Sequence, residues 1–254
     1  MIDVEQKSNW TRNDIDYLKN VTITEYDLRS GGFSVIKEYK LLDQKYIDEI
    51  SKLEKEQQKI TIGKLQIKIP DLSKKMVEGF VKARKEFVTK NNVSEDNILS
   101  IKKDALFLIN CFNITGKLSD NLEFREKNSY SSYIRLNNKE FYYSSSANDL
   151  DVKGLGDKER ELQQLFLLKN IKIFLKQAEK ISKYELYKSL KDFRSKYLNR
   201  KLPVETYRNL DSGTFIMLDS NFEMDNVNEQ MVNNIDISYN YKYYIMPLIQ
   251  KILL

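Results

Sequence analysis

The segment 98–109, Ile-Leu-Ser-Ile-Lys-Lys-Asp-Ala-Leu-Phe-Leu-Ile, constrains the fold more than any other part of the chain. Two apolar, β-prone runs flank the charged tripeptide Lys102-Lys103-Asp104. Two such runs meeting at a charged tip are typical of a β-hairpin that buries both arms and exposes its turn. We therefore expect Asp104 at the tip of a hairpin.

A second acid lies in a comparable position nearer the N-terminus. The β-prone run 21–26 leads into Asp27, and Gly31-Gly32 then break the strand before an apolar, helix-compatible segment beginning at Phe33. This order predicts a carboxylate at the end of a strand. An acid in such a place is also typical of a solvated turn or a helix cap, so Asp27 alone specifies no function.

Hydrophobic periodicity predicts the elements around these two acids. We expect a short arm or helix in 1–20, a helix in 41–59 with Asp43 as N-cap, a strand in 60–69, a helix in 71–90, a hairpin with strands 130–136 and 140–145 around Asn137-Asn138, and helices in 158–199. The fold class is α+β, with an antiparallel sheet backed by helices. The tail 204–254 is mixed and gives no clear assignment.

Basic side chains follow two of the predicted helices. In 41–59, Lys52, Lys55 and Lys59 share one side, and in 71–90 Lys82, Arg84 and Lys85 lie on the outer side. A solvated helix face accounts for such lysines as readily as a binding surface does.

The composition excludes several kinds of catalytic and metal-binding site. The 254 residues include no histidine and a single cysteine, Cys111, so catalytic triads with histidine, zinc sites rich in cysteine and a disulfide framework are excluded. Chemistry must then use carboxylates, lysines, hydroxyls and hard metals. We expect Cys111 to be a small core residue.

The balance of 42 Lys+Arg against 37 Asp+Glu gives a net charge of +5, which permits a polyanionic partner. No apolar run reaches the length of a membrane span, and the N-terminus has no apolar targeting segment, so we expect a cytoplasmic protein without a membrane partner. Abundant Lys, Asn, Ile and Tyr indicate an A/T-rich genome, as in a phage or a low-GC bacterium; for a phage, the compartment would be the host cytoplasm.

The two acids resemble the catalytic motifs of family B DNA polymerases. The stretch Asp27-Leu-Arg-Ser-Gly-Gly-Phe-Ser-Val-Ile36 is similar to motif A, Asp-x-x-Ser-Leu-Tyr-Pro-Ser-Ile-Ile, with Asp27, Ser30, Ser34 and Ile36 in register. The stretch 100–108 is similar to motif C, Tyr-Gly-Asp-Thr-Asp-Ser-Ile-Phe-Val, with Asp104 at its second aspartate.

Two later segments extend the resemblance in the same order, so that it covers roughly residues 21–160. Lys127-Asn-Ser-Tyr130 is similar to the Lys-x-Tyr segment that holds the primer, and Asp151-Val-Lys-Gly-Leu155 is similar to the Lys-Gly-Leu stretch before the thumb.

The resemblance implies three regions: an N-terminal arm (1–20), a palm (21–156) whose fingers are reduced to an insertion at 41–63, and a helical thumb with the C-terminal region (157–254). It also implies a two-metal nucleotidyl transfer with Mg²⁺ or Mn²⁺ held by Asp27 and Asp104. The remaining roles that the resemblance implies are nucleotide binding by Ser30, Gly31, Gly32, Phe33, Lys55 and Lys59, and primer or template binding by Lys127, Tyr130 and Lys153. The partners would be a primed DNA template, nucleoside triphosphates and other replication subunits.

The sequence also departs from the family. Lys102 replaces the first aspartate of motif C, and motif B, Lys-x-x-x-Asn-Ser-x-Tyr-Gly, is absent, as is any preceding exonuclease domain. Gly32 stands where the family has the tyrosine that excludes a ribose 2′-hydroxyl, which leaves the choice of sugar open.

Three hypotheses follow from these observations. The chain is a small DNA polymerase or primase-like enzyme, a nucleic-acid-binding or replisome-scaffold subunit that keeps a palm without catalysis, or an unrelated α+β phage protein whose motif matches are accidental. Taken singly, Tyr130 and Lys153 fit ordinary surface positions on strands better than a functional role.

Overall fold

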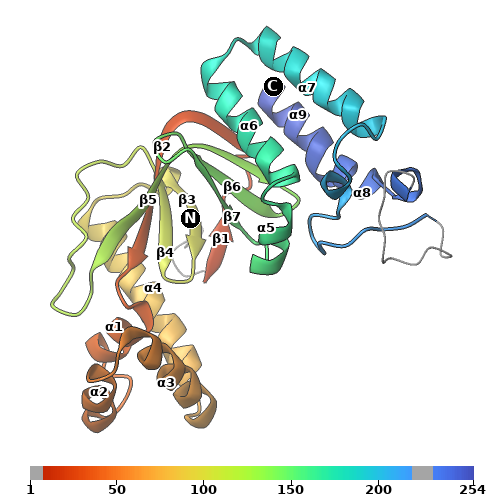
Figure 1. Ribbon diagram of the computed structural model, residues 1–254. Helices are drawn as coiled ribbons and strands as arrows, with labels where there is room; N and C mark the ends of the chain where they lie inside the picture. The colour runs from red at the N-terminus through yellow and green to blue at the C-terminus, as the bar shows by residue number, and fades with distance from the viewer. Residues whose placement is uncertain (1–7, 219–230) are drawn as a thin grey trace. The chain divides into compact units, whose positions relative to one another are not determined.

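The structure, a computed structural model, describes residues 8–218 and 231–254 (Figure 1). The chain divides into two compact units: unit 1 is Met1–Ile15 with Thr22–Ser129, and unit 2 is Asp16–Val21 with Tyr130–Leu254. Two strands, β2 (Tyr17–Leu28) and β5 (Phe124–Leu136), contribute residues to both units. Antiparallel strands and helices occur together, so the predicted α+β class, with an antiparallel sheet backed by helices, is confirmed.

The sheet of unit 1 places β2 beside the predicted hairpin. Its strand order is β1-β3-β4-β2-β5, with β1 (Asn9–Thr11), β3 (Ile98–Lys102) and β4 (Ala105–Ile109). Strands β3 and β4 pair antiparallel up to Lys102 and Ala105, which leaves Lys103 and Asp104 in the turn and confirms the predicted hairpin. Strand β4 also pairs antiparallel with β2, so the hairpin lies directly against the strand that carries Asp27.

Four helices connect β2 to this hairpin: α1 (Gly31–Glu38), α2 (Gln44–Ser51), α3 (Lys55–Lys68) and α4 (Leu72–Lys90). The predicted helix 71–90 is confirmed as α4, and a 3₁₀ turn, Glu95–Asn97, leads from it to β3. In Figure 1, α1, α2 and α3 gather around one end of α4. The other end packs under the sheet, where the Phe87 ring lies 5.4 Å from that of Tyr26 and 4.5 Å from that of Phe124.

Successive side chains of β2 point to opposite faces of the sheet. Tyr26 packs against α4, so Glu25 and Asp27 point to the other face. The alternation that buries Tyr26 therefore sends two carboxylates away from the apolar core.

Three sequence-based expectations for unit 1 were wrong. The segment 41–59 forms two helices, because the chain breaks at 52–54, and the predicted strand 60–69 belongs to α3. The buried residue Ile62 and the half-buried Leu65 and Ile69 recur at helical spacing and pack into one cluster, whereas Ile67 of the apparent alternation is 87% exposed. Helical packing of these three side chains overrode the pattern of alternate residues.

The third error concerns Arg84, which was expected on the outer side of its helix but is 1% exposed. Within the predicted arm 1–20, the described residues form β1 and the start of β2 and no helix, and residues 1–7 lie outside the described residues.

Unit 2 contains the three antiparallel strands that end the seven-stranded sheet. Strands β6 (Lys139–Ser144) and β7 (Asp149–Lys153) follow β5 in the order β5-β6-β7. The predicted hairpin around Asn137-Asn138 is confirmed, and both asparagines have positive φ (44° and 60°), as a tight two-residue turn requires.

The predicted helical region 158–199 is also confirmed, as three helices: α5 (Asp157–Gln163), α6 (Leu167–Lys180) and α7 (Lys183–Leu198). The unassigned tail contains 3₁₀ segments at Val204–Tyr207 and Met231–Asn234, the short helix α8 (Ser238–Asn240), a π-helical turn at Tyr241–Ile245, and α9 (Met246–Leu253).

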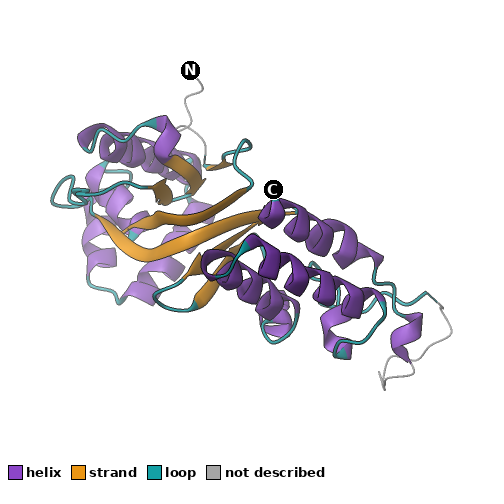
Figure 2. Ribbon diagram, turned by 90° about the horizontal axis from the view of Figure 1, so that it is seen from above, coloured by secondary structure: helices purple, strands orange, loops and turns teal. Residues whose placement is uncertain are grey.

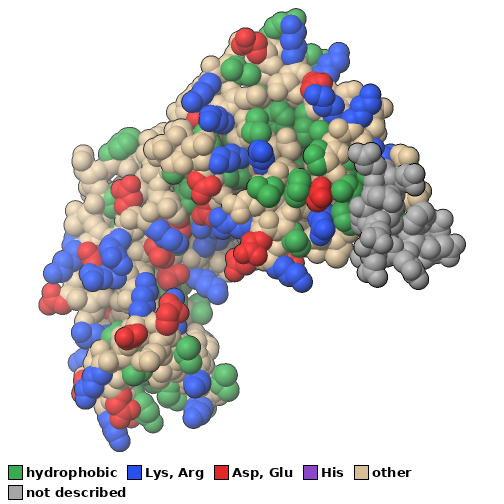
Figure 3. All heavy atoms as spheres, in the orientation of Figure 1, with side chains coloured by type: hydrophobic (Ala, Val, Ile, Leu, Met, Phe, Trp, Pro, Cys, Tyr) green, Lys and Arg blue, Asp and Glu red, His purple; other side chains and the backbone are tan. Residues whose placement is uncertain are grey.

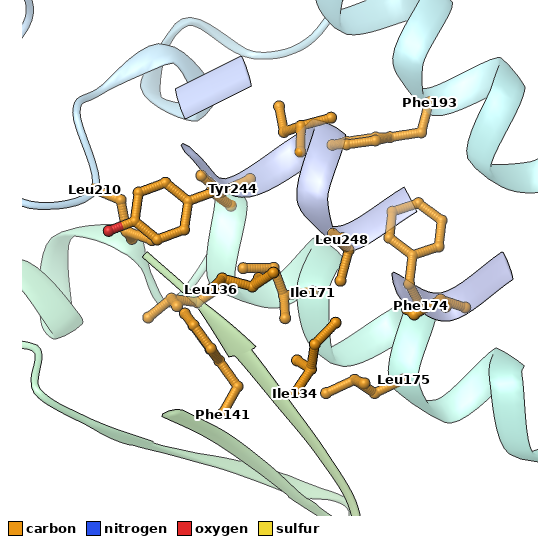
Figure 4. Close-up of a cluster of buried hydrophobic side chains, with 14 of the residues drawn as sticks. Ile134, Leu136, Phe141, Ile171, Phe174, Leu175, Phe193, Leu210, Tyr244 and Leu248 are labelled. Carbon is orange, nitrogen blue, oxygen red and sulfur yellow. The ribbon is translucent and has the colours of Figure 1, made fainter. Parts of the chain in front are cut away.

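Helices α6, α7 and α9 pack beside one another (Figure 2). Their apolar faces form one core with the inner residues of β5 and β6, including Ile134, Phe141, Ile171, Phe174 and Leu248 (Figure 4).

Candidate functional site

The two predicted acids lie next to each other in unit 1. Asp27 pairs across the β2–β4 ladder with Ala105, the residue after Asp104, and the Leu28 N–H donates to the Asp104 carbonyl at 3.1 Å. Lys103 has a positive φ of 51°, so the hairpin turns sharply just before Asp104. Strand register and turn geometry together bring the two carboxyl groups to one place.

A cavity of about 350 Å³ opens over this acid pair. It is lined by Asp27, Leu28, Ser30, Gly31, Gly32, Phe33, Lys55, Gln58, Lys59, Ile62 and Asp104. The eight residues that the sequence analysis assigned to catalysis or nucleotide binding are all in this set. Leu28, Gln58 and Ile62 were not predicted; Gln58 and Ile62 follow from α3, whose helical turns present them beside the two lysines.

The loop between β2 and α1 forms one wall of this pocket. Ser30 has φ 50°, and the Ser34 hydroxyl donates to the Arg29 carbonyl at 2.6 Å, which fixes the turn into the helix. At Gly31 an added Cβ would overlap the Asp104 carboxylate, which would have to shift. At Gly32 an added Cβ would lie 3.3 Å from Met76 Cε and 3.9 Å from Ile62 Cδ1, so a side chain there would begin against the helices.

Burial acts on both carboxyl groups, and repulsion by Asp104 acts on Asp27. Desolvation raises the pKa of Asp27, and the neighbouring Asp104 charge raises it further. Desolvation also raises the pKa of Asp104, against the lowering effects of its backbone hydrogen bond and the charges of Lys127, Lys103 and Arg84. The pair therefore favours a nearby positive charge.

Glu25 is a third carboxylate beside the pair, and sequence reasoning missed it. It is 1% exposed, and it accepts hydrogen bonds from Lys127 Nζ at 3.2 Å and Asn128 Nδ2 at 2.9 Å. Its position two residues before Asp27, on the same face of β2, was the available signal. Lys127, predicted to contact primer or template, is thus anchored by a buried acid, and its charge lowers the pKa of both aspartates.

Arg84 supports the hairpin turn from the α4 side. Its Nη1 donates to the Lys103 carbonyl, and burial lowers the pKa of its guanidinium to about 10. The Asp104 charge acts in the opposite direction on that pKa, which indicates a favourable interaction between the two groups. Lys102, which replaces a motif C aspartate, donates to Thr11 Oγ1 at 3.0 Å and does not line the pocket.

The other two residues predicted to bind primer or template lie in unit 2, where they meet at one acid. The Tyr130 hydroxyl donates to Asp151 Oδ2 at 2.9 Å, and Lys153 Nζ lies 2.7 Å from the same oxygen. Arg160 Nη1 is 3.6 Å from Asp151 Oδ1. Tyr130 itself is buried against Tyr142, so the alternative of an ordinary surface position is wrong for this residue.

The pocket offers two carboxylates, Asp27 and Asp104, to a hard divalent cation. Within the described residues, no group of three or more His, Cys, Asp or Glu side chains is placed to hold a metal ion. Mg²⁺ prefers oxygen ligands and is commonly held by one or two carboxylates together with substrate phosphates and waters. Asp27 and Asp104 supply such a donor pair, and their repulsion would be relieved by a cation.

A larger cavity of about 430 Å³ lies along Thr22, Thr24 and Tyr26 of β2 and the loop 111–116. These strand residues alternate with Glu25 and Asp27, so this cavity opens on the other face of β2. The predicted core residue Cys111 is half-buried at its wall, where desolvation raises the thiol pKa.

Every helix in the described parts of the chain is too short or too polar to cross a lipid bilayer.

Comparison with known proteins gives one family. No curated protein matches the chain. One protein family, described as the bacteriophage PBS1 gene 130 protein, matches residues 1–254. Because this match covers the whole sequence, the chain belongs to the bacteriophage PBS1 gene 130 protein family.

Proposed function

We propose that this phage protein is a template-directed nucleotidyltransferase, a small polymerase or primase-like enzyme, whose active site is the unit 1 pocket. The observation that carries the proposal is the convergence of Asp27, Asp104 and six predicted nucleotide-binding residues in a single cavity of about 350 Å³. Those residues come from β2, α1, α3 and a hairpin turn that are up to 77 positions apart in sequence (27 to 104).

The lining residues suit a nucleoside triphosphate. Lys55, and Lys59 on exchanging its exposed pair with Glu56 for a phosphate, would neutralise its phosphates, and Phe33 offers an apolar surface for the base. The first N–H groups of α1, which begins at Gly31, add partial positive charge near the phosphates.

Asp27 and Asp104 would hold Mg²⁺ or Mn²⁺. When bound, such ions lower the pKa of an attacking 3′-hydroxyl and stabilise the leaving pyrophosphate. Arg84 would keep the hairpin carrying Asp104 in place from the α4 side, and Lys127, anchored by Glu25, would offset the negative charge of the two aspartates.

The chain topology supports a palm-like arrangement. A strand ending at the first acid, helices, and then a hairpin that carries the second acid and pairs with that strand follow the order that the family B resemblance implies. In unit 2 we assign Lys153 to contacts with primed DNA; Tyr130 is 4% exposed and would act indirectly, by holding Asp151, the ion-pair partner of Lys153. Such an enzyme would act in the cytoplasm of the bacterial host, together with other replication proteins.

The test is primer extension with Mg²⁺ or Mn²⁺, a primed template, and all eight nucleotides. We expect Asp27→Asn and Asp104→Asn each to lower extension on the order of 100-fold or more, since each removes a metal-binding charge. Asp48→Asn, on the exposed face of α2, is the matched control and should leave extension unchanged.

Two results would reject the proposal, the first its active site and the second its activity. Extension that survives both active-site substitutions would remove these acids from the mechanism. Template binding without extension by the wild-type protein would favour a non-catalytic nucleic-acid-binding or scaffold subunit.

A further inference from the structure

The outer face of α3 exposes two large apolar side chains. Ile60 is 57% exposed and Ile67 is 87% exposed, and with Gly63 between them they form the α3 stripe (Ile60, Gly63, Ile67). The spacing i, i+3, i+7 places these three residues on one side of the helix. In Figure 3, hydrophobic and basic side chains are interspersed on the surface over α3.

Gly63 has no packing explanation within the described part of the chain. A Cβ built at this position would meet nothing within 4 Å apart from its own helix and chain neighbours. Glycine disfavours a helix interior relative to alanine, so its presence here weakens α3 without relieving any crowding. A glycine between two exposed isoleucines makes a notch into which another backbone can fit closely.

The charges around the stripe specify the partner. Helix α3 contains four lysines and one glutamate, and Lys59, Lys64 and Lys68 border the stripe. The single acid, Glu56, lies one turn before Ile60 and pairs with Lys59 at 2.7 Å, so Lys64 and Lys68 carry the positive charge at the border of the stripe. We propose that the α3 stripe binds the apolar face of a helix from another protein, whose flanking residues are acidic.

A second copy of this chain fits the stripe poorly. Antiparallel pairing of two α3 helices about Gly63 and Lys64 would set Ile60 against Ile67, but it would also set Lys59 against Lys68. Parallel pairing would place each lysine beside its own equivalent. Nucleic acid is also a poor match, because phosphates give no favourable contact to two isoleucines.

The test uses a fluorescein-labelled amphipathic helical peptide of about 20 residues, long enough to span α3, with a Leu/Ala seam bordered by Glu. The matched peptide has Lys in place of Glu. We expect fluorescence anisotropy with the full-length protein to show binding of the acidic peptide at least about tenfold tighter than that of the basic peptide.

Two variants locate the binding to the stripe. Ile67→Ser removes an exposed anchor, and Gly63→Leu fills the notch; each should weaken acidic-peptide binding about tenfold. Neither position is packed, so the thermal midpoint should not fall, and Gly63→Leu should raise it. Ile173→Ser, at a partly exposed isoleucine of α6, is the control and should bind as wild type does.

Equal affinity for the two peptides, or acidic-peptide binding unchanged by Ile67→Ser and Gly63→Leu, would overturn the proposal. Dimerisation in analytical ultracentrifugation that Ile67→Ser abolishes would assign the stripe to a second copy instead. Duplex DNA binding lost through the same substitution would assign it to nucleic acid. Primer extension is not part of this test, so its outcome is independent of the proposed activity.

Discussion

Glu25 and Lys127 have opposite electrostatic effects on the acid pair, Asp27 and Asp104. Replacing Glu25 with glutamine removes a buried negative charge while keeping the shape, and we expect the Mg²⁺ or Mn²⁺ affinity of the pocket to fall roughly threefold to tenfold. Lys127→Met removes the opposing charge and should raise that affinity by a similar factor. Titration of Mn²⁺ followed by electron paramagnetic resonance measures both without requiring activity.

The double variant Glu25→Gln with Lys127→Met controls for damage to the fold. It should bind Mn²⁺ with nearly wild-type affinity, because the two charge changes compensate. Equal shifts in the same direction for both single variants would show that the pair has no electrostatic role at the site.

Asp211 makes stability depend on pH. It accepts hydrogen bonds from Tyr239, Tyr244 and Asn137 and pairs with Lys139, all within unit 2. Although desolvation raises the pKa of Asp211, these partners together lower it below its ordinary value. Stability from Asp211 is then fully present above pH ~4, the ordinary Asp pKa, and is lost as pH falls through the folded-state pKa.

We therefore expect Asp211→Asn to lower the free energy of unfolding by about 2 kcal/mol at pH 7, with the difference from wild type shrinking below pH ~4. Urea denaturation across this pH range measures it. Asp192→Asn, which removes an exposed pair with Lys196, should change stability by less than about 0.5 kcal/mol.

At the level of the helices, two glycines predict opposite effects of the same substitution. Gly63→Ala in α3 meets open space and should stabilise the protein by about 0.5–1 kcal/mol. Gly79→Ala in α4 should destabilise it by about 1–3 kcal/mol, because the added Cβ would overlap Val35 of α1 and approach Tyr39. Thermal denaturation of the two variants distinguishes them, and equal shifts would contradict the assigned packing.

At the scale of the whole molecule, the short segment Asp16–Val21 belongs to unit 2, although the rest of unit 2 follows unit 1 in the chain. Asp16 binds Arg135 at 2.8 Å and Lys251 at 3.2 Å, and Tyr17 packs against the unit 2 core. Unit 2 therefore requires residues that precede unit 1's first helix in the chain.

This arrangement gives a test at the scale of the units. Tyr17→Ala should lower stability by about 2–3 kcal/mol, and hydrogen exchange should increase first in α6 and α9 of unit 2. Trp10→Ala, which removes a side chain packed on the unit 1 core, is the counterpart and should act on β3 and α4. Uniform exchange in both variants would show that the two units open together.

Local sequence patterns predicted the structure correctly where the residues that specify an element are adjacent in the chain. The hairpin 98–109, the helix 71–90 and the Asn137-Asn138 turn each carry periodicity or turn chemistry in adjacent residues, and all three were predicted correctly. The two acids of the pocket were predicted from a strand end and a hairpin tip, and its other predicted residues came from the resemblance to family B polymerases.

Only the tertiary structure decided the rest. Residues 60–69 alternate like a strand, but Ile62, Leu65 and Ile69 could be buried together only on a helix packed against α1 and α4. Arg84 and Glu25 look like surface charges in the sequence, but both are buried. Arg84 has the Lys103 carbonyl as a hydrogen-bond partner, and Glu25 has the Lys127 ammonium group. Sequence by itself determined the hairpins, their turns and the positions of the two acids at a strand end and a hairpin tip. Long-range packing determined which charges lose water, because desolvation depends on neighbours that are distant in the chain.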